Sequence, residues 1–353
     1  MMRPLADALE RAAPPRGATT AVCVPDGTRP VDVSAALAAL RPHLGGRVTV
    51  VIGLGLHRRM TADELPRGPW PIVQHDPDDC VDTGEVDGIP GGVARHVADA
   101  EVVLGLGIVE LHQYAGFSGG HKAVSVGCGA RRTLDALHHR DRVTAPGVRL
   151  GRLEGNPFRE AVDALGARAR CRWVALTHGG GWRCGEPVAT LREAASALDC
   201  WVDVPTRHAA AVLRVPRVKA SSFYQASRAA TYLGLSDDPP LTPNATLYLD
   251  AACPEGLGAG DGERAFAAAL ASCPPPWDAL LTGPAPAGAG AQRAIMIAQL
   301  ARRFSLVVCG VDDPAPLRAA GLEATRAPAA AVAPDGALEV ADPFGRLPRF
   351  NAR

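Results

Sequence analysis

The stretch from residue 111 to residue 140 holds the densest set of side chains that could do chemistry. It carries His112, a turn at Ser118-Gly119-Gly120, Lys122, and the pair His138-His139. Glycines let the backbone turn tightly and bring its N–H groups close to an anion, as in phosphate-binding loops. A glycine-rich turn alone is usually only a turn, and a lone histidine is usually a satisfied polar residue. Their combination in one short stretch indicates a site.

Four apolar runs precede further polar side chains of this kind. Each run is rich in β-branched residues and leucine and predicts a buried strand; they span residues 19–25, 47–55, 71–76 and 101–109. The polar residues at their C-terminal ends are Asp26 with Arg29, His57, His75, and His112. In a parallel sheet these ends share one edge, where ligands bind in open α/β folds. For the turn at residues 26–30, a solvated turn capped by Asp26 is an equally good interpretation.

One segment of the second half has a similar pattern. On a helix predicted from residue 222 to 233, Gln225 and Arg228 are three residues apart and face the same way. A planar guanidinium beside an amide suits a carboxylate. By itself the segment fits an ordinary amphipathic helix better.

Strands alternate with helices throughout the chain, which predicts an α/β fold with mainly parallel sheets. In the first half, helices are expected at residues 33–43, 130–142, 158–166 and 189–200, and a further strand at 171–178. The second half predicts strands at 209–215, 245–252, 277–281 and 305–311, and helices at 222–233, 263–271, 291–304 and 316–320. The expected helix 130–142 would carry His138 and His139 about two turns from its start.

The pattern pauses near residues 202–208, so we expect two α/β domains, 1–206 and 207–353, with the active-site cleft between them. In a variant of this division, about the last 15 residues return to the first domain.

Composition excludes several classes of protein. Lys+Arg and Asp+Glu both number 37, so nothing indicates a nucleic-acid or anionic-membrane partner. No apolar run has the length of a membrane span, and the first 17 residues lack the apolar core of a signal peptide. The nine cysteines are scattered and form no C-x-x-C. A cytoplasmic protein with reduced cysteines is expected.

These motifs resemble the nickel-pincer lactate racemase family. The resemblance rests on H-x-Y-A-G-F-S-G-G-x-K from His112 to Lys122 and a histidine 26 residues after the first. The resemblance covers most of the chain in collinear order: D-x-T-R, G-x-H-R and H-D precede this motif, and G-N-P-x-R-E and F-Y-Q-A-S follow it. Arg228 stands where the family typically has a lysine, and Leu111 where it usually has a proline.

The family implies a two-domain α/β fold and racemisation or epimerisation of a 2-hydroxy acid. Its cofactor is a nickel-pincer nucleotide, a pyridinium-3-thioamide-5-thiocarboxylic acid mononucleotide that can be joined covalently to a lysine. By motif, the resemblance implies that Lys122 is the cofactor-linked lysine, that His138 is the nickel ligand, and that His75 and His112 are the acid–base pair. It places near the cofactor Asp26, Thr28, Gly119 and Gly120. The residues that it implies as substrate contacts are Arg29, Tyr224, Gln225 and Arg228. It also implies partners, namely the cofactor-biosynthesis enzymes and a small-molecule 2-hydroxy acid.

The chemistry of inversion accounts for this residue set. The α-hydrogen of a hydroxy acid is a very weak acid, because its removal as a proton would place negative charge beside the carboxylate. Departure as hydride avoids this, provided that a base takes the hydroxyl proton and an electron-poor cofactor accepts the hydride. The flat keto acid must accept hydride on either face, so an acid–base group is needed on each side. Histidine serves both roles near neutral pH.

Two other functions fit less well. A nicotinamide-dependent 2-hydroxyacid dehydrogenase would carry G-x-G-x-x-G after a first strand, which the chain does not have. A non-catalytic protein that stores the nickel nucleotide would need Lys122 and His138 but not His75 and His112. Bound nickel would distinguish the racemase from the dehydrogenase, and turnover of a 2-hydroxy acid would distinguish it from the storage protein.

Overall fold

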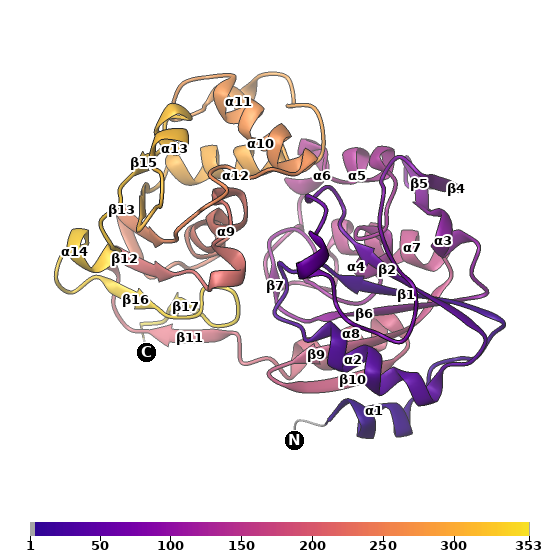
Figure 1. Cartoon of the computed structure of the whole chain (residues 1–353). Helices are drawn as coiled ribbons and strands as arrows, with labels where there is room; N and C mark the ends of the chain where they lie inside the picture. Colours follow the sequence, from indigo (N-terminus) through magenta and orange to yellow (C-terminus); the bar gives the residue numbers. More distant parts are fainter. Residues whose placement is uncertain (1–3, 353) are drawn as a thin grey trace. The chain divides into compact units, whose positions relative to one another are not determined.

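The computed structural model describes residues 4–352, which divide into two compact units. The first unit holds the chain up to Leu137 together with Thr144–Leu198, and the second holds His138–Val143 with the chain from Asp199 onward. Both are α/β structures built mainly on parallel strands, so the predicted fold class is confirmed (Figure 1). Among residues 4–352, no helix combines the length and apolarity that a bilayer span requires.

The first unit is organised around a six-stranded sheet of order β10-β9-β6-β1-β2-β3. All neighbours in it pair in parallel except β9 and β10. Its strands are β1 (Thr19–Pro25), β2 (Arg47–Gly53), β3 (Ile72–Gln74), β6 (Val102–Ile108), β9 (Cys171–His178) and β10 (Gly181–Gly185); two small antiparallel pairs are β4 (Cys80–Val86) with β5 (Ile89–Ala94) and β7 (Leu111–His112) with β8 (Gly116–Phe117). The helices are α1 (Leu5–Arg11), α2 (Val33–Leu40), η1 (Arg41–His43), η2 (Ala62–Glu64), α3 (Arg95–Ala98), α4 (Lys122–Ser125), α5 (Arg131–Leu137), α7 (Pro157–Arg168) and α8 (Pro187–Ser196).

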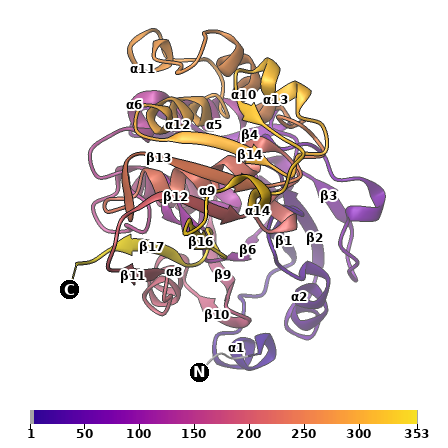
Figure 2. The same cartoon turned by 90° about the vertical axis from the view of Figure 1, so that its left-hand side faces the viewer.

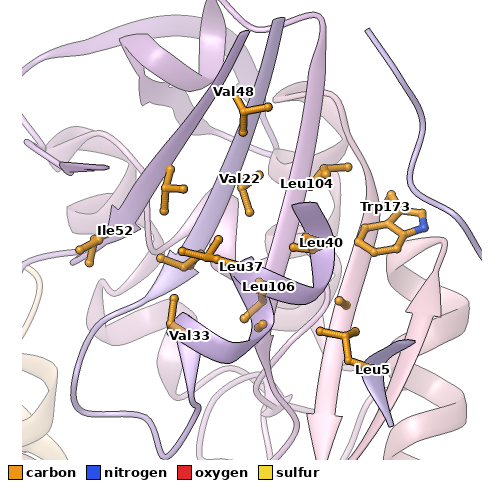
Figure 3. Close-up of a cluster of buried hydrophobic side chains, with 14 of the residues drawn as sticks. Leu5, Val22, Val33, Leu37, Leu40, Val48, Ile52, Leu104, Leu106 and Trp173 are labelled. Carbon is orange, nitrogen blue, oxygen red and sulfur yellow. The ribbon is translucent and has the colours of Figure 1, made fainter. Parts of the chain in front are cut away.

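One face of this sheet forms the main core of the first unit. Valine and leucine side chains of β1, β2 and β6 pack there with Trp173 and with α1 and α2, as Figure 3 shows. On the opposite face α4 lies close to the sheet, since a Cβ built on Gly105 of β6 would be 3.6 Å from Ala123. The alternation of side chains along each strand thus supplies two apolar faces, which is typical of a parallel sheet covered on both sides.

The second unit has a five-stranded parallel sheet of order β15-β14-β13-β12-β16. Its strands are β12 (His208–Arg214), β13 (Leu241–Asp250), β14 (Ser305–Cys309), β15 (Glu323–Ala324) and β16 (Leu338–Val340), and β11 (Trp201–Val204) pairs with β17 (Leu347–Phe350) beside it. The helices are α6 (Arg140–Val143), η3 (Arg217–Lys219), α9 (Phe223–Gly234), α10 (Asp261–Ala271), α11 (Ala279–Thr282), α12 (Gln292–Ala301), α13 (Ala315–Ala319) and α14 (Ala329–Val332). A small hydrophobic cluster around Val212, Val307 and Ala329 packs α14 against this sheet. The helix and the strands β12, β13, β14 and β16 are labelled in Figure 2.

Two expected elements are wrong. The predicted helix 130–142 is broken: α5 ends at Leu137, and α6 begins at Arg140. The predicted strand 277–281 is instead occupied by α11, which begins at Ala279. A short apolar run does not distinguish a strand from a helix by its pattern alone.

Candidate active site

The polar residues predicted at the strand ends do lie at one edge of the first sheet. β6, β1, β2 and β3 are consecutive parallel neighbours, so their carboxyl ends share that edge. Two contacts between side chains from different strands span it. Asp26 after β1 reaches His57 after β2, and Arg29 after β1 reaches Glu110 after β6.

Asp26 is the most strongly held carboxylate at this edge. It is 7% exposed, and its Oδ1 accepts hydrogen bonds from the N–H of Thr28 at 3.1 Å and from its hydroxyl at 2.6 Å. Oδ2 lies 2.7 Å from Nδ1 of His57. Burial alone would raise the pKa of Asp26, but His57, the Thr28 hydroxyl and Arg29 together lower it well below its usual range. Asp26 is therefore a fixed anion.

This carboxylate also sets the tautomer of His57. A carboxylate only accepts, so Nδ1 of His57 carries the hydrogen that faces Asp26, and the lone pair of the neutral ring is on Nε2. The His57 side chain is 24% exposed. A partly exposed imidazole oriented by a buried carboxylate has an arrangement that suits a general base. The strand-end pattern named His57 but did not predict this pairing.

Arg29, predicted as a substrate contact, binds Glu110. Its Nη1 is 2.5 Å from Oε1 of Glu110, and the two side chains are only 14% and 10% exposed. Glu110 lies two residues after the end of β6 and was not expected to take part in the site. Its carboxylate fixes one arm of the guanidinium, which stays cationic in proteins.

His75 lies in the interior of the first unit. Its side chain is 2% exposed, and Nε2 donates to the carbonyl oxygen of Gly129 at 3.0 Å. Nδ1 is buried and has no hydrogen-bond partner among residues 4–352. Burial lowers the pKa of His75 to about 4, with Arg59 adding to the effect and Asp76 opposing it. The ring is thus neutral at physiological pH, with its lone pair in a dry environment.

His112 is half-buried on β7 and has the opposite tautomer to His57. Its Nδ1 accepts from the backbone N–H groups of Tyr114 at 3.3 Å and Ala115 at 3.1 Å. In the neutral ring the hydrogen is therefore on Nε2. The ring also packs edge-on against Tyr114, with centroids 5.8 Å apart. His112 thus presents a hydrogen-bond donor, whereas His57 presents an acceptor.

The glycine turn leads directly into α4, as the sequence indicated. Gly119 and Gly120 have φ values of +93° and +60°, and Lys122 is the first residue of the helix. Ser118 is held by a hydrogen bond from its hydroxyl to the carbonyl of Ile108 at 2.7 Å. Gly119 and Gly120 both have the positive φ that favours glycine, which lets the backbone turn tightly between Ser118 and Lys122. Lys122 is partly exposed at the end of this turn.

The predicted metal ligand His138 belongs to the second unit. It lies between α5 and α6 rather than inside one helix, and its side chain is half-buried. The segment is held by Arg140, whose Nη1 donates to the carbonyl oxygen of Gly283 at 2.6 Å. α6 also packs against α12. This attachment is why the expected continuous helix does not form.

The predicted substrate residues of the second unit lie on α9. Arg228 donates through Nε to the carbonyl of Gln225 at 3.2 Å and through Nη2 to the Gln225 side-chain oxygen. The Gln225 amide donates to Glu263 at 3.4 Å, and Gln225 and Arg228 are 0% and 8% exposed. Tyr224 packs edge-on against Phe266 at 5.5 Å. The two residues do face the same way, but they are buried rather than on an amphipathic helix surface.

No group of three or more His, Cys, Asp or Glu side chains able to hold a metal occurs in the described part of the chain. All nine cysteines are free thiols. One feature of the described residues is compatible with the phosphate of a nucleotide cofactor. Gly119 and Gly120, both with positive φ, form a tight turn that leads into α4, whose first residue is Lys122.

The fold and the strand-end residues define an α/β protein with a glycine-rich turn and several histidines at or near one edge of its first sheet. Residues 3–151 match the family model described as the lactate racemase N-terminal domain. The lactate racemase of Lactiplantibacillus plantarum is 29% identical over 139 residues, 36% of this chain and 33% of that protein. The lactate racemase of Thermoanaerobacterium thermosaccharolyticum is 26% identical over 165 residues, 42% of this chain and 39% of that protein. The matched segments thus span well under half of these relatives.

Solved structures extend the likeness to the whole fold. The lactate racemase apoprotein from Thermoanaerobacterium thermosaccharolyticum superposes with a TM-score of 0.78 at 17% identity, covering 98% of this chain and 92% of that one. A protein from Thermotoga maritima has a TM-score of 0.73 at 14% identity, covering 98% and 96%. The N-terminal part of the chain is thus similar in sequence to lactate racemases, in agreement with the motifs, and the likeness in fold extends over the whole chain.

Proposed function

We propose that the protein is an isomerase that racemises or epimerises a 2-hydroxy acid with a nickel-pincer nucleotide. The observation that carries the proposal is the sheet edge of the first unit, where the glycine turn and Lys122 occur with the Asp26–His57 pair and His112. The N-terminal match to lactate racemases supports the same reaction.

The cofactor would be held by the backbone of Gly119 and Gly120, by Lys122, and by His138 as the protein ligand of nickel, with Asp26 and Thr28 near it. When bound, it supplies an electron-poor ring that accepts and returns the substrate's α-hydrogen with its electron pair. A metal with one imidazole ligand draws its other donors from the nucleotide, and nitrogen with sulfur donors suits nickel.

The chain's own residues then handle protons and orientation. Arg29, fixed by Glu110, would bind the substrate carboxylate, and Gln225, Arg228 and Tyr224 are the predicted contacts from the second unit. His112 and His75 are the acid–base pair predicted from the motifs. The geometry favours His57 over His75 as the partner of His112, because Nε2 of His57 is its lone-pair nitrogen and its side chain is 24% exposed, whereas His75 is 2% exposed.

For His112 to accept a proton at Nε2, its ring must leave the N–H groups of Tyr114 and Ala115, since these fix Nδ1 as an acceptor. A proton that His57 accepts at Nε2 leaves the bond from Nδ1 to Asp26 in place, and the buried carboxylate stabilises the charge that results. The two rings therefore begin in complementary states, one as acceptor and one as donor. Transfer in the reverse direction would exchange these states.

The test is to produce the chain with the cofactor-biosynthesis enzymes, then measure bound nickel, intact mass, and conversion of single enantiomers of 2-hydroxy acids. We expect nickel near one per chain, and conversion of at least one acid to its mirror form. Bound nickel without conversion across a broad panel would support storage of the nucleotide instead. Consumption of a 2-hydroxy acid only when a nicotinamide nucleotide is added would support a 2-hydroxyacid dehydrogenase instead.

A further inference from the structure

A buried cluster of charged residues adjoins the glycine turn in the first unit. Arg159 on α7 is 2% exposed and holds Asp163 with both arms of its fork, Nε to Oδ2 at 3.0 Å and Nη2 to Oδ1 at 2.6 Å. Nδ1 of His121 lies 2.9 Å from the same Oδ1, and Nε2 of His121 donates to the carbonyl of Cys171 at 3.1 Å. Burial would raise the pKa of Asp163, but His121 and Arg159 lower it overall.

One main-chain oxygen joins this cluster to the turn. Nη1 of Arg159 donates to the carbonyl oxygen of Gly119 at 3.3 Å. Because a trans peptide is planar, the N–H of Gly120 points away from that oxygen and hence away from Arg159. His121 directly precedes Lys122, so the same cluster also fixes the backbone at the first residue of α4.

We propose that Arg159, Asp163 and His121 are positioning residues that set the orientation of the Gly119–Gly120 peptide. They aim the Gly120 N–H at the bound anion and hold Lys122 in register beside it. The identity of the anion, the phosphate of the nucleotide, rests on the proposed function, whereas the orientation of the peptide does not. Apolar residues would join α4 to α7 without the desolvation cost of buried charges, so a role in orientation explains why charges occur here.

A cavity beside the cluster makes the proposal testable by chemical rescue. It has a volume of about 150 Å³ and is lined in part by Arg159, Asp163 and Leu191. Replacing Arg159 by alanine extends this space and exposes the Asp163 carboxylate. A guanidinium ion from solution can then occupy the position of the missing fork, since it pairs with a carboxylate in the same bidentate way.

The first measurement uses the full chain without cofactor and follows hydrogen exchange of the backbone amides of residues 118–122. Arg159→Ala should raise their exchange about tenfold to a hundredfold, the range expected for loss of a hydrogen bond to a charged group. Amides of β6 should change little. Millimolar guanidinium, far below unfolding concentrations, should restore protection, and equal urea or potassium chloride should not. Arg168→Ala, exposed at the end of the same helix and outside the cavity lining, is the matched control.

The second measurement is the nickel content of the same variants produced with the cofactor-biosynthesis enzymes. We expect Arg159→Ala and the milder Arg159→Lys to retain less nickel than the parent and Arg168→Ala. Unchanged exchange at residues 118–122 in Arg159→Ala would overturn the positioning role. Equal increases at β6 without rescue by guanidinium would also overturn it, because they indicate a general loss of structure. Rescued exchange in chains that never bind nickel would support the positioning role and contradict the proposed cofactor.

Discussion

At the scale of single residues, three histidines at or near one sheet edge differ in what their surroundings allow. His57 is oriented by a buried carboxylate, His112 by two backbone N–H groups, and His75 by one carbonyl oxygen in a dry interior. The sequence placed all three after strands. It could not predict their tautomers or burial, because these depend on residues far along the chain, such as Gly129 beside His75.

Turnover should separate these histidines. His57→Gln and His112→Gln should each lower kcat by about 10² to 10⁴, the usual contribution of a positioned acid–base group, with nickel content unchanged. His75→Gln can still donate to Gly129 and should lower kcat by less than either. The measurement is the initial rate of enantiomer interconversion in chains of equal nickel content. A larger loss in His75→Gln than in His57→Gln would restore His75 as the partner of His112.

The pH dependence of the free energy of unfolding tests whether His75 is a buried neutral ring. Its pKa is about 4 in the folded chain and about 6.5 in the unfolded chain, so the unfolded state binds the proton first. The contribution of His75 to the free energy of unfolding is therefore full above about pH 6.5. It falls by about 3 kcal/mol as the pH drops from about 6.5 to about 4, because the unfolded chain binds the proton more tightly. Urea unfolding of the parent and His75→Gln across this range should show a shallower slope for the variant. Parallel curves would mean that His75 is not a buried neutral ring.

At the scale of elements, the strands that carry the site follow directly from the sequence. Residues 19–25 and 171–178 form β1 and β9 with the predicted bounds, because continuous apolar runs favour a sheet buried on both faces. The β4–β5 hairpin was not predicted, although the Asp87-Gly88 pair at its turn, with φ values of +49° and +73°, is a strong local signal. The break between α5 and α6 could not be predicted, because it depends on the contact of Arg140 with distant Gly283.

The glycine turn is the element whose conformation matters most for the site. Gly120→Ala should destabilise the chain by about 1–2 kcal/mol, because φ is +60° there. An added Cβ would also lie 3.1 Å from Leu191. Gly180→Ala is a matched control with φ +82° and nothing within 4 Å of its Cβ. Both should lower the denaturation midpoint, but only Gly120→Ala should also lower nickel content. Equal nickel content in the two variants would contradict a cofactor role for the turn.

At the scale of the whole molecule, the two units carry different parts of the predicted site. The first holds the residues predicted as the acid–base pair and the glycine turn, and the second holds His138 with Gln225 and Arg228. The collinear motifs predict this set of residues, and its roles stay predictions. The pattern could not predict that residues 138–143 group with the second unit.

Metal analysis tests the role of His138. His138→Ala should lose bound nickel. Its free energy of unfolding, measured without cofactor, should stay within about 0.5 kcal/mol of that of the parent, since the residue is half-buried and outside the core. His139→Ala, at the exposed neighbouring position, should keep both. Nickel at parental levels in His138→Ala would show that another residue holds the metal.

The most direct test of the central claim uses a single enantiomer of a 2-hydroxy acid that carries deuterium at its α-carbon. The nickel-loaded chain should convert it to the mirror form with the deuterium retained, because the α-hydrogen leaves and returns as one unit without entering water. Chiral chromatography with mass spectrometry measures both quantities at once. An enantiomer that stays unchanged, or a product that has exchanged its deuterium for solvent hydrogen, would contradict the account.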